Sequence, residues 1–128
     1  MNIMKLISAK RALTNYLDDK MPPSLAYKIM KLVCAAESEE VFYKKELQKI
    51  IEQYGKRNDD DSLVTTDTGN IVLLEGTVQE CRQKINELEA LDVDAPSISF
   101  TLDELSCITM TVREMNAISA FISDGGQA

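Results

Sequence analysis

The stretch SLAYKIMKLVCAAESEEVFYKKELQKIIEQY, residues Ser24–Tyr54, decides the fold that this sequence predicts. Its apolar residues recur at alternating spacings of four and three, the heptad pattern of a helix that packs along one seam. Leu25, Leu32 and Ile51 widen the seam into the broader stripe of a helix in a globular core. Two prolines precede the stretch and a glycine follows it, so we expect one helix about 45 Å long. The seam consists of Ile29, Val33, Ala36, position 40, Tyr43, Leu47, Ile50 and Tyr54.

A carboxylate interrupts this seam, because position 40 is a glutamate. A buried carboxylate without a partner costs too much free energy to occur, which leaves three interpretations. In the first, Glu40 points to solvent at a local stagger of the seam. In the second, it belongs to an acidic cluster on which a basic partner docks. In the third, it is half-buried against a basic side chain and locks the register of the N-terminal segment, the candidates being Lys5, Lys10 and Arg11.

A second, shorter helix is predicted from Thr77 to about residue 91. Thr77 and Glu80 have the spacing of a capping box, and apolar residues from Val78 to Leu91 repeat the three-four pattern. A β-hairpin predicted at 62–75 reverses the chain, so the two helices run antiparallel. The shorter helix, about 21 Å long, covers half of the long one and ends near position 40. The predicted core of this helical hairpin is Val33, Leu47, Ile50, Ile85 and Leu88.

These patterns together predict the α+β class, in a single domain of 128 residues. Its small antiparallel sheet would come from 62–75, 97–101 and 3–7, and Ser8 would cap the first helix. Capping-box spacings at 101–104 and 111–114 mark closing helices, and no internal repeat is apparent. The predicted parts are a strand and helix in 1–21, the helical hairpin with its β-hairpin in 24–91, a strand and closing helices in 97–122, and a loose tail in 123–128.

Composition argues against catalysis and against a bound metal. The chain has no His, so it lacks the commonest general base and the commonest metal ligand. It also contains no Gly-rich phosphate loop, paired-Cys metal motif or EF-hand loop, and we therefore predict neither enzymatic activity nor a cofactor. The three cysteines are too few and too widely spaced for a disulfide framework. Cys34, Cys81 and Cys107 are instead predicted to be small buried apolar residues.

The sequence predicts a cytoplasmic protein without membrane contact. No apolar run approaches the roughly 18 residues that a membrane-spanning helix needs. Charged residues interrupt every apolar stretch among the first twenty positions, so no signal peptide is expected there.

Charge is distributed unevenly along the chain. Residues 1–57 carry eleven basic and seven acidic side chains, a net charge of +4. The remainder carries three basic and fourteen acidic side chains, a net charge of −11, which accounts for the total of −7. An acidic region of this kind favours a protein partner with a basic surface and disfavours direct binding of nucleic acid. Self-association of the chain is left open.

Two acidic groups are the candidate partner-binding residues. The first, Glu37, Glu39 and Glu40, lies at the interruption of the seam, and the second flanks the predicted strand at 97–101. Opposite charge accelerates encounter with a basic partner, and salt weakens that effect. The second group consists of Asp92, Asp94, Asp103 and Glu104.

The order of several short motifs resembles an uncharacterised family of small proteins encoded by tailed phages and prophages of Gram-positive bacteria. The resemblance covers about residues 22–122 and departs from the family where TVQECRQK replaces a more Phe-rich second helix. It implies a phage origin and does not imply a mechanism, because the family has no known activity to assign to residues of this chain. The motifs are SLAYKIMKL, IIEQYGKRND, INELEALDVD, ISFTLDEL and TVREMNAISAFI.

Two functions fit these observations. The first is a stoichiometric inhibitor of a host or defence factor that binds through the acidic residues, which the charge of −11 favours. The alternative is a minor virion or tail-assembly component, for which a long helix is an equally suitable part. The first is the preferred hypothesis.

Overall fold

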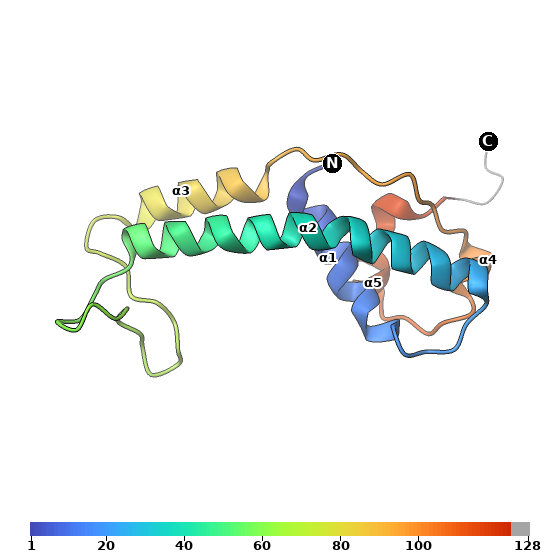
Figure 1. Cartoon of the computed structure of the whole chain (residues 1–128), viewed down its shortest axis with the longest axis horizontal. Helices are drawn as coiled ribbons and strands as arrows, with labels where there is room; N and C mark the ends of the chain where they lie inside the picture. Colours follow the sequence, from blue (N-terminus) through green and yellow to red (C-terminus); the bar gives the residue numbers. More distant parts are fainter. Residues whose placement is uncertain (124–128) are drawn as a thin grey trace. The chain divides into compact units, whose positions relative to one another are not determined.

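The computed structural model describes residues 1–123, of which 58% are helical. Pro23–Tyr54 forms one continuous helix of 32 residues, α2, as the heptad pattern predicted (Figure 1). No β-strand or sheet occurs among these residues, so the predicted α+β class is wrong. The other elements are α1 (Ile3–Leu13), the 3₁₀ turn η1 (Thr14–Tyr16), α3 (Val78–Glu89), α4 (Leu102–Leu105), α5 (Val112–Ala117) and the 3₁₀ turn η2 (Ser119–Phe121).

The strand predicted at 3–7 is the first half of α1. Asn2 has an extended backbone, and its side-chain oxygen accepts a hydrogen bond from the Lys5 N–H at 2.8 Å. This contact caps the helix by satisfying one of the N–H groups that a first helical turn leaves without a partner. The cap predicted at Ser8 was therefore six residues late. The error arose because a short apolar run fits a buried strand and a buried helix equally well.

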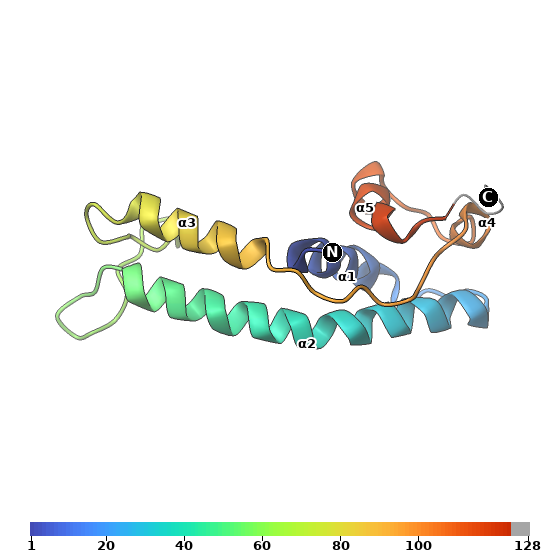
Figure 2. The same ribbon diagram turned by 90° about the horizontal axis from the view of Figure 1, so that it is seen from above.

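The described chain divides into two compact units, and the boundary between them falls within α2, after Glu40. The first unit comprises Met1–Glu40 and the segment that begins at Asp92. In this unit α1 crosses the N-terminal half of α2, as Figure 1 and Figure 2 together show, and α5 contacts α1. The core of the first unit is fully buried and consists of Leu6, Ala9, Leu13, Leu25, Ile29, Leu32, Ala36, Phe100, Leu105, Ile118 and Phe121.

The second unit, Val41–Leu91, contains the C-terminal half of α2 and the shorter helix α3. The Tyr43 hydroxyl lies 3.2 Å from a Glu89 carboxylate oxygen near the end of α3, and Figures 1 and 2 both show the helices side by side and antiparallel. Among the predicted core residues Leu88 is buried, whereas Leu47, Ile50 and Ile85 are half-buried, as is Val33 in the first unit. Half-burial is the expected state of a seam that only two helices share.

Isolated backbone bridges replace the predicted strands. The segment 62–75 reverses direction as expected, but a single bridge, Thr65↔Ile71, stands where a β-hairpin ladder was predicted. Near 97–101 the described residues form one contact of this kind, a parallel bridge between Phe100 and Ile122. In 62–75 the turn between the two runs was recognised correctly, but the residues on either side of it pair with different segments and form no continuous ladder.

The C-terminal segment of the first unit confirms two of the three predicted capping boxes. Thr101 with Glu104 begins α4 and Thr111 with Glu114 begins α5, each with both reciprocal hydrogen bonds. Thr77 does not cap α3 with its side chain, because its backbone is helical and its hydroxyl donates to the Leu74 carbonyl at 2.6 Å. The closing helix predicted after the capping box at 111–114 ends at Ala117, and η2 follows it. Of the predicted tail at 123–128, residues 124–128 lie outside the described residues.

Candidate functional site

The carboxylate that interrupts the seam is buried and paired. Glu40 is 7% exposed; its Oε1 accepts a hydrogen bond from Lys10 Nζ at 2.5 Å and its Oε2 one from Arg11 Nε at 3.1 Å. The third interpretation from the sequence is thus confirmed for two of its candidate bases, Lys10 and Arg11, although the carboxylate is buried rather than half-buried. Because both bases belong to α1, this cluster joins α1 to α2 inside the first unit. Glu40 serves the fold there and is not an exposed acid.

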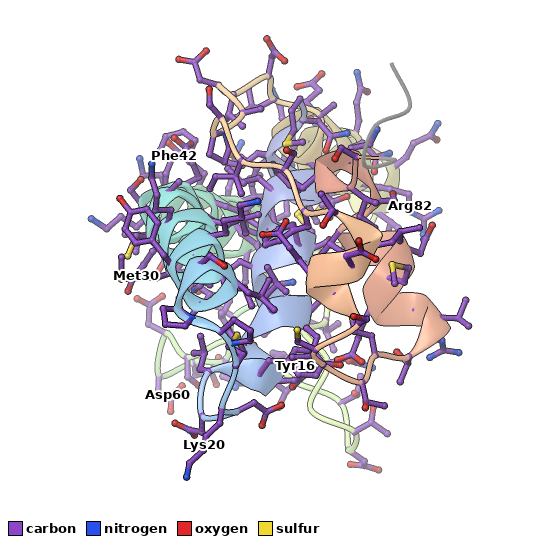
Figure 3. All side chains as sticks on the ribbon, turned by 90° about the vertical axis from the view of Figure 1, so that its right-hand side faces the viewer. Tyr16, Lys20, Met30, Phe42, Asp60 and Arg82 are labelled. Atoms are coloured by element: carbon purple, nitrogen blue, oxygen red, sulfur yellow. The ribbon has the colours of Figure 1, made fainter. Side chains whose placement is uncertain are left out.

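A second polar cluster joins the N-terminal and C-terminal segments of the first unit. Glu114, at the start of α5, accepts hydrogen bonds from Tyr16 Oη at 2.5 Å and from Asn15 Nδ2 at 2.8 Å. Tyr16 lies where α1 ends, beside the C-terminal segment (Figure 3). The Thr111 N–H, followed by the Tyr16 hydroxyl, lowers the pKa of Glu114 to about 2. Burial, followed by the hydrogen bond to Glu114, raises the pKa of Tyr16 to about 12.

A third cluster surrounds Glu104, which was predicted to bind a partner. Lys28 of α2 lies 2.7 Å from its carboxylate, and the Thr101 N–H donates to the same oxygen. Lys28, followed by the Thr101 N–H, lowers the pKa of Glu104. Glu104 thus both caps α4 and ties that short helix to α2, so its carboxylate has a structural use.

The remaining predicted partner-binding residues differ in their accessibility. Glu37 is exposed and Glu39 is half-buried on α2. Asp94 and Asp103 are exposed, and neither forms an ion pair with a described residue. Asp92 is also exposed, and its carboxylate lies 2.9 Å from the amino group of Met1. The structure therefore separates the seven predicted acids into those with internal contacts and those left on the surface.

The uneven charge of the sequence does not become a separation of charge between the two units. Counted over the described residues, each unit carries seven basic and ten acidic side chains. Folding places C-terminal acids beside N-terminal bases, as Glu104 with Lys28 illustrates. Acidic surface must therefore be sought as local groups of side chains rather than as one half of the molecule.

Two cavities open on the first unit. The larger, about 390 Å³, lies between α1 and the α5–η2 segment and has a mixed lining, whose polar residues include Asn2, Lys5 and Ser119. The smaller, about 260 Å³, is mainly apolar and lies between the η1 region and α2. Its lining includes Met30, which is exposed on the outer side of α2 (Figure 3).

The prediction for the cysteines was correct at one position only. Cys81 is buried, as expected, in the seam of α3. Cys34, which lines the smaller cavity, and Cys107 are exposed, so the prediction of buried thiols was wrong for both. Cys34 lies at the edge of the seam, because the seam residues Ile29 and Val33 line the same cavity.

Sequence reasoning did not recognise the regular spacing of three acids in the connection between α2 and α3. Asp59, Asp67 and Glu75 are exposed and lie eight residues apart, each within a turn of the segment 55–78. The signal was present in the sequence as an acidic residue at every eighth position, in three turn-rich stretches of equal length.

Comparison with known proteins gives this chain no relative: no family model, curated protein or solved structure matches it. The resemblance to phage proteins therefore stays a prediction. Within residues 1–123, no group of three or more His, Cys, Asp or Glu side chains is placed to hold a metal ion. In the same residues, no helix combines the length and the apolar character needed to cross a bilayer.

Proposed function

We propose that this chain is a non-catalytic, phage-encoded protein-binding module that acts in the host cytoplasm as a stoichiometric inhibitor of a host or defence factor. The observation that carries the proposal is the presence of exposed carboxylates that the fold does not use. Asp94 and Asp103 have no ion pair with a described residue, whereas nearby Glu104 is paired and caps a helix. Carboxylates left on the surface are available to a partner with a basic surface, including a site that evolved to bind phosphate.

The test begins with capture of the partner. The tagged chain is passed through lysate of a Gram-positive host, retained proteins are identified by mass spectrometry, and the candidate is purified. Association and dissociation rates are then measured at low and at physiological salt. We expect association to slow as salt shortens the range of the charges to about 8 Å. An affinity that is unchanged by salt would contradict an electrostatic interface.

A matched pair of double variants locates the surface. D94K/D103K reverses two exposed acids of the first unit, and D59K/D67K makes the same change of charge in the second unit. We expect D94K/D103K to lower the association rate at least ~10-fold, with a smaller effect of D59K/D67K. Melting temperatures should match the parent, because neither pair includes an acid of a buried cluster. Equal effects of the two variants would show that only net charge matters.

The alternative function is a minor virion or tail-assembly component. It is favoured by the helical hairpin of the second unit, because α2 and α3 pair through a heptad seam of the kind that many fibrous assemblies use. Mass spectrometry of purified particles separates the two functions. An inhibitor is absent from particles, and a structural component is present at a fixed ratio to the other virion proteins.

A further inference from the structure

We infer that residues 55–78 form a closed ring of three equivalent eight-residue steps, and that this ring acts as a clamp that fixes where α2 ends and α3 begins. The steps are Gly55–Ser62, Leu63–Asn70 and Ile71–Val78. The inference concerns the architecture of the second unit and does not depend on the proposed function.

The second residue of each step supplies the first set of equivalent contacts. Each of these residues donates its backbone N–H to one of the other two and accepts from the remaining one, so the three hydrogen bonds run in a circle. They are Val64 N to Lys56 O at 2.8 Å, Val72 N to Val64 O at 2.9 Å and Lys56 N to Val72 O at 2.8 Å. A circle of this kind leaves no unpaired edge between the steps, in contrast to an open hairpin.

The backbone bridges repeat with the same period. In each case the third residue of one step pairs with the first residue of the next, and the last step pairs back to the first. The three bridges are Arg57↔Leu63, Thr65↔Ile71 and Gly55↔Leu73. The segments therefore do not form strands, because each one changes partner after two residues.

The turns follow the same rule. The seventh residue of each step donates its N–H to the carbonyl of the fourth, in the pairs Asp61–Asn58, Gly69–Thr66 and Thr77–Leu74. Asp61 and Gly69, which occupy the seventh position of the first two steps, both have positive φ, at 69° and 85°. In the third step the positive φ moves one residue earlier, to Gly76, because Thr77 already leads into α3.

The centre of the ring explains the glycine that ends α2. The first residues of the three steps, Gly55, Leu63 and Ile71, approach one another, and Gly55 is buried. A Cβ on Gly55 would lie 2.6 Å from Leu63 Cδ2 and 2.7 Å from the Ile51 carbonyl oxygen, closer than any side chain tolerates. Glycine therefore lets the end of α2 occupy the central space beside the other two steps.

The ring holds both helices at their ends. The Leu74 N–H donates to the carbonyl of Tyr54, the last residue of α2, at 2.8 Å. The equivalent N–H groups of the first two steps, on Asn58 and Thr66, donate to the last residue of their own step, so Tyr54, which precedes the first step, takes the place of the last residue of the third step. On the other side, the Thr77 carbonyl accepts from the Cys81 N–H in the first turn of α3. These contacts fix the helix ends relative to the ring.

The direct test uses the full, unaltered chain. Amide exchange and hydrogen-bond scalar couplings are measured by NMR for Lys56, Val64 and Val72. We expect all three amides to be protected, with rates within about threefold of one another, because one opening event breaks the circle. Each amide should couple to the carbonyl that closes the circle. Fast exchange at one of the three, with protection at the other two, would overturn the inference.

Two substitutions test the equivalence of the steps. Asp61→Gly places glycine where Gly69 stands in the next step, and it retains the backbone carbonyl that accepts from Arg57 at 2.7 Å. We expect an unchanged or higher melting temperature, because glycine relieves the positive φ. Asp60→Gly is the control one position away; it removes the carboxylate that accepts from the Ser62 N–H at 3.0 Å and should lower the melting temperature. A larger loss for Asp61→Gly than for Asp60→Gly would contradict the repeat.

A third variant tests the clamp. Gly55→Ala should abolish protection of all three amides together and weaken the hydrogen bond from the Leu74 N–H to the Tyr54 carbonyl. Gly69→Ala is the control, because its added Cβ meets no atom within 4 Å and only the positive φ is strained. Loss of protection at a single amide in Gly55→Ala would contradict a cooperative ring. If that variant does not fold, the measurements on the unaltered chain decide the question.

Discussion

The two halves of α2 carry the same pattern and are buried to different depths. In the first unit Leu25, Ile29 and Leu32 are at most 3% exposed, whereas in the second unit Leu47, Ile50 and Ile51 are only half-buried. The N-terminal half is covered by α1 and the C-terminal segment, and the other half by α3 and the ring. The spacing of apolar residues thus gives the direction in which a helix face points. The depth of burial depends on how much of the chain covers that face.

The largest expected effect compares one leucine from each half of the helix. Leu32→Ala should lower the free energy of unfolding by about 2–5 kcal/mol, because the residue is fully buried. Leu47→Ala should cost roughly 1–2 kcal/mol, since the half-exposed site removes less area from water. Urea titration followed by far-UV circular dichroism measures both. Equal losses would show that the second unit has a core as deep as the first.

The next effect concerns the two bases that hold Glu40. Lys10→Met should cost on the order of 1–3 kcal/mol, because the Lys10 side chain is 16% exposed and its loss leaves the buried carboxylate with one base fewer among the contacts described. Arg11→Met should cost under about 1 kcal/mol, because the Arg11 side chain is 52% exposed and its ion pair is screened by water. The same titration measures both variants. A larger loss for Arg11→Met would reverse the assigned order.

A smaller effect compares the threonines that precede a helix in each unit. Thr101→Ala removes a capping-box hydroxyl and should cost about 1 kcal/mol. Thr77→Ala should cost less, roughly 0.5 kcal/mol, because the Thr77 side chain makes no capping hydrogen bond to α3. Thermal melting of the two variants beside the parent is sufficient. If Thr77→Ala lowers the melting temperature more than Thr101→Ala, the hydrogen bond from Thr77 to the Leu74 carbonyl contributes more to stability than the cap of α4.

The smallest effect is the pH dependence that arises from the contact between Tyr16 and Glu114 in the first unit. The folded state lowers the pKa of Glu114 from its ordinary 4.5 to about 2, so its stabilisation is complete above pH 4.5 and is lost as the pH falls towards 2. The folded state raises the pKa of Tyr16 from 10 to about 12, so that contribution is complete below pH 10 and is lost as the pH rises towards 12.

Melting curves between pH 2 and pH 12 test these two windows. Glu114→Gln should flatten the acid limb relative to the parent, and Tyr16→Phe should flatten the alkaline limb. Asp103→Asn is the control, because it removes an exposed carboxylate without an ion pair to a described residue. An acid limb that is equally steep in the parent and in Glu114→Gln would place the titration elsewhere.

The sequence predicted the helices best where the pattern is long and has clear ends. The 31 residues of Ser24–Tyr54 contain several repeats of the seam, and the helix found there begins one residue earlier, at Pro23. Shorter patterns were ambiguous, as at residues 3–7, where five residues fit a strand or a helix. The α+β class was wrong because the β-branched residues of 62–75 were taken as strands, and their pairing with a third segment was invisible to a local pattern.

The sequence predicted which acidic residues are candidates for the site, but not which of them are exposed on the surface. The carboxylate at position 40 was singled out, and one of its three interpretations named the two bases that bind it. Which acids remain on the surface could not be read from spacing. Lys28 reaches Glu104 across 76 positions of sequence, and contacts at such separation depend on the tertiary fold. The acidic residue at every eighth position of the connection was visible in the sequence. The backbone hydrogen bonds are needed to show that this spacing marks three equivalent steps.

The ring makes the connection at the end of the helical hairpin independent of how long the two helices are. Each helix rises about 1.5 Å per residue and the seam repeats every seven residues, so adding one heptad to both helices would extend the hairpin by roughly 10 Å and return every seam residue to its face. The segment 55–78 would then meet the same helix ends as before. Insertion of one to three residues into a single helix would instead rotate its seam away from its partner. Natural variants with a longer or shorter hairpin are therefore expected to differ by one heptad in each of the two helices, with a connection of the same length.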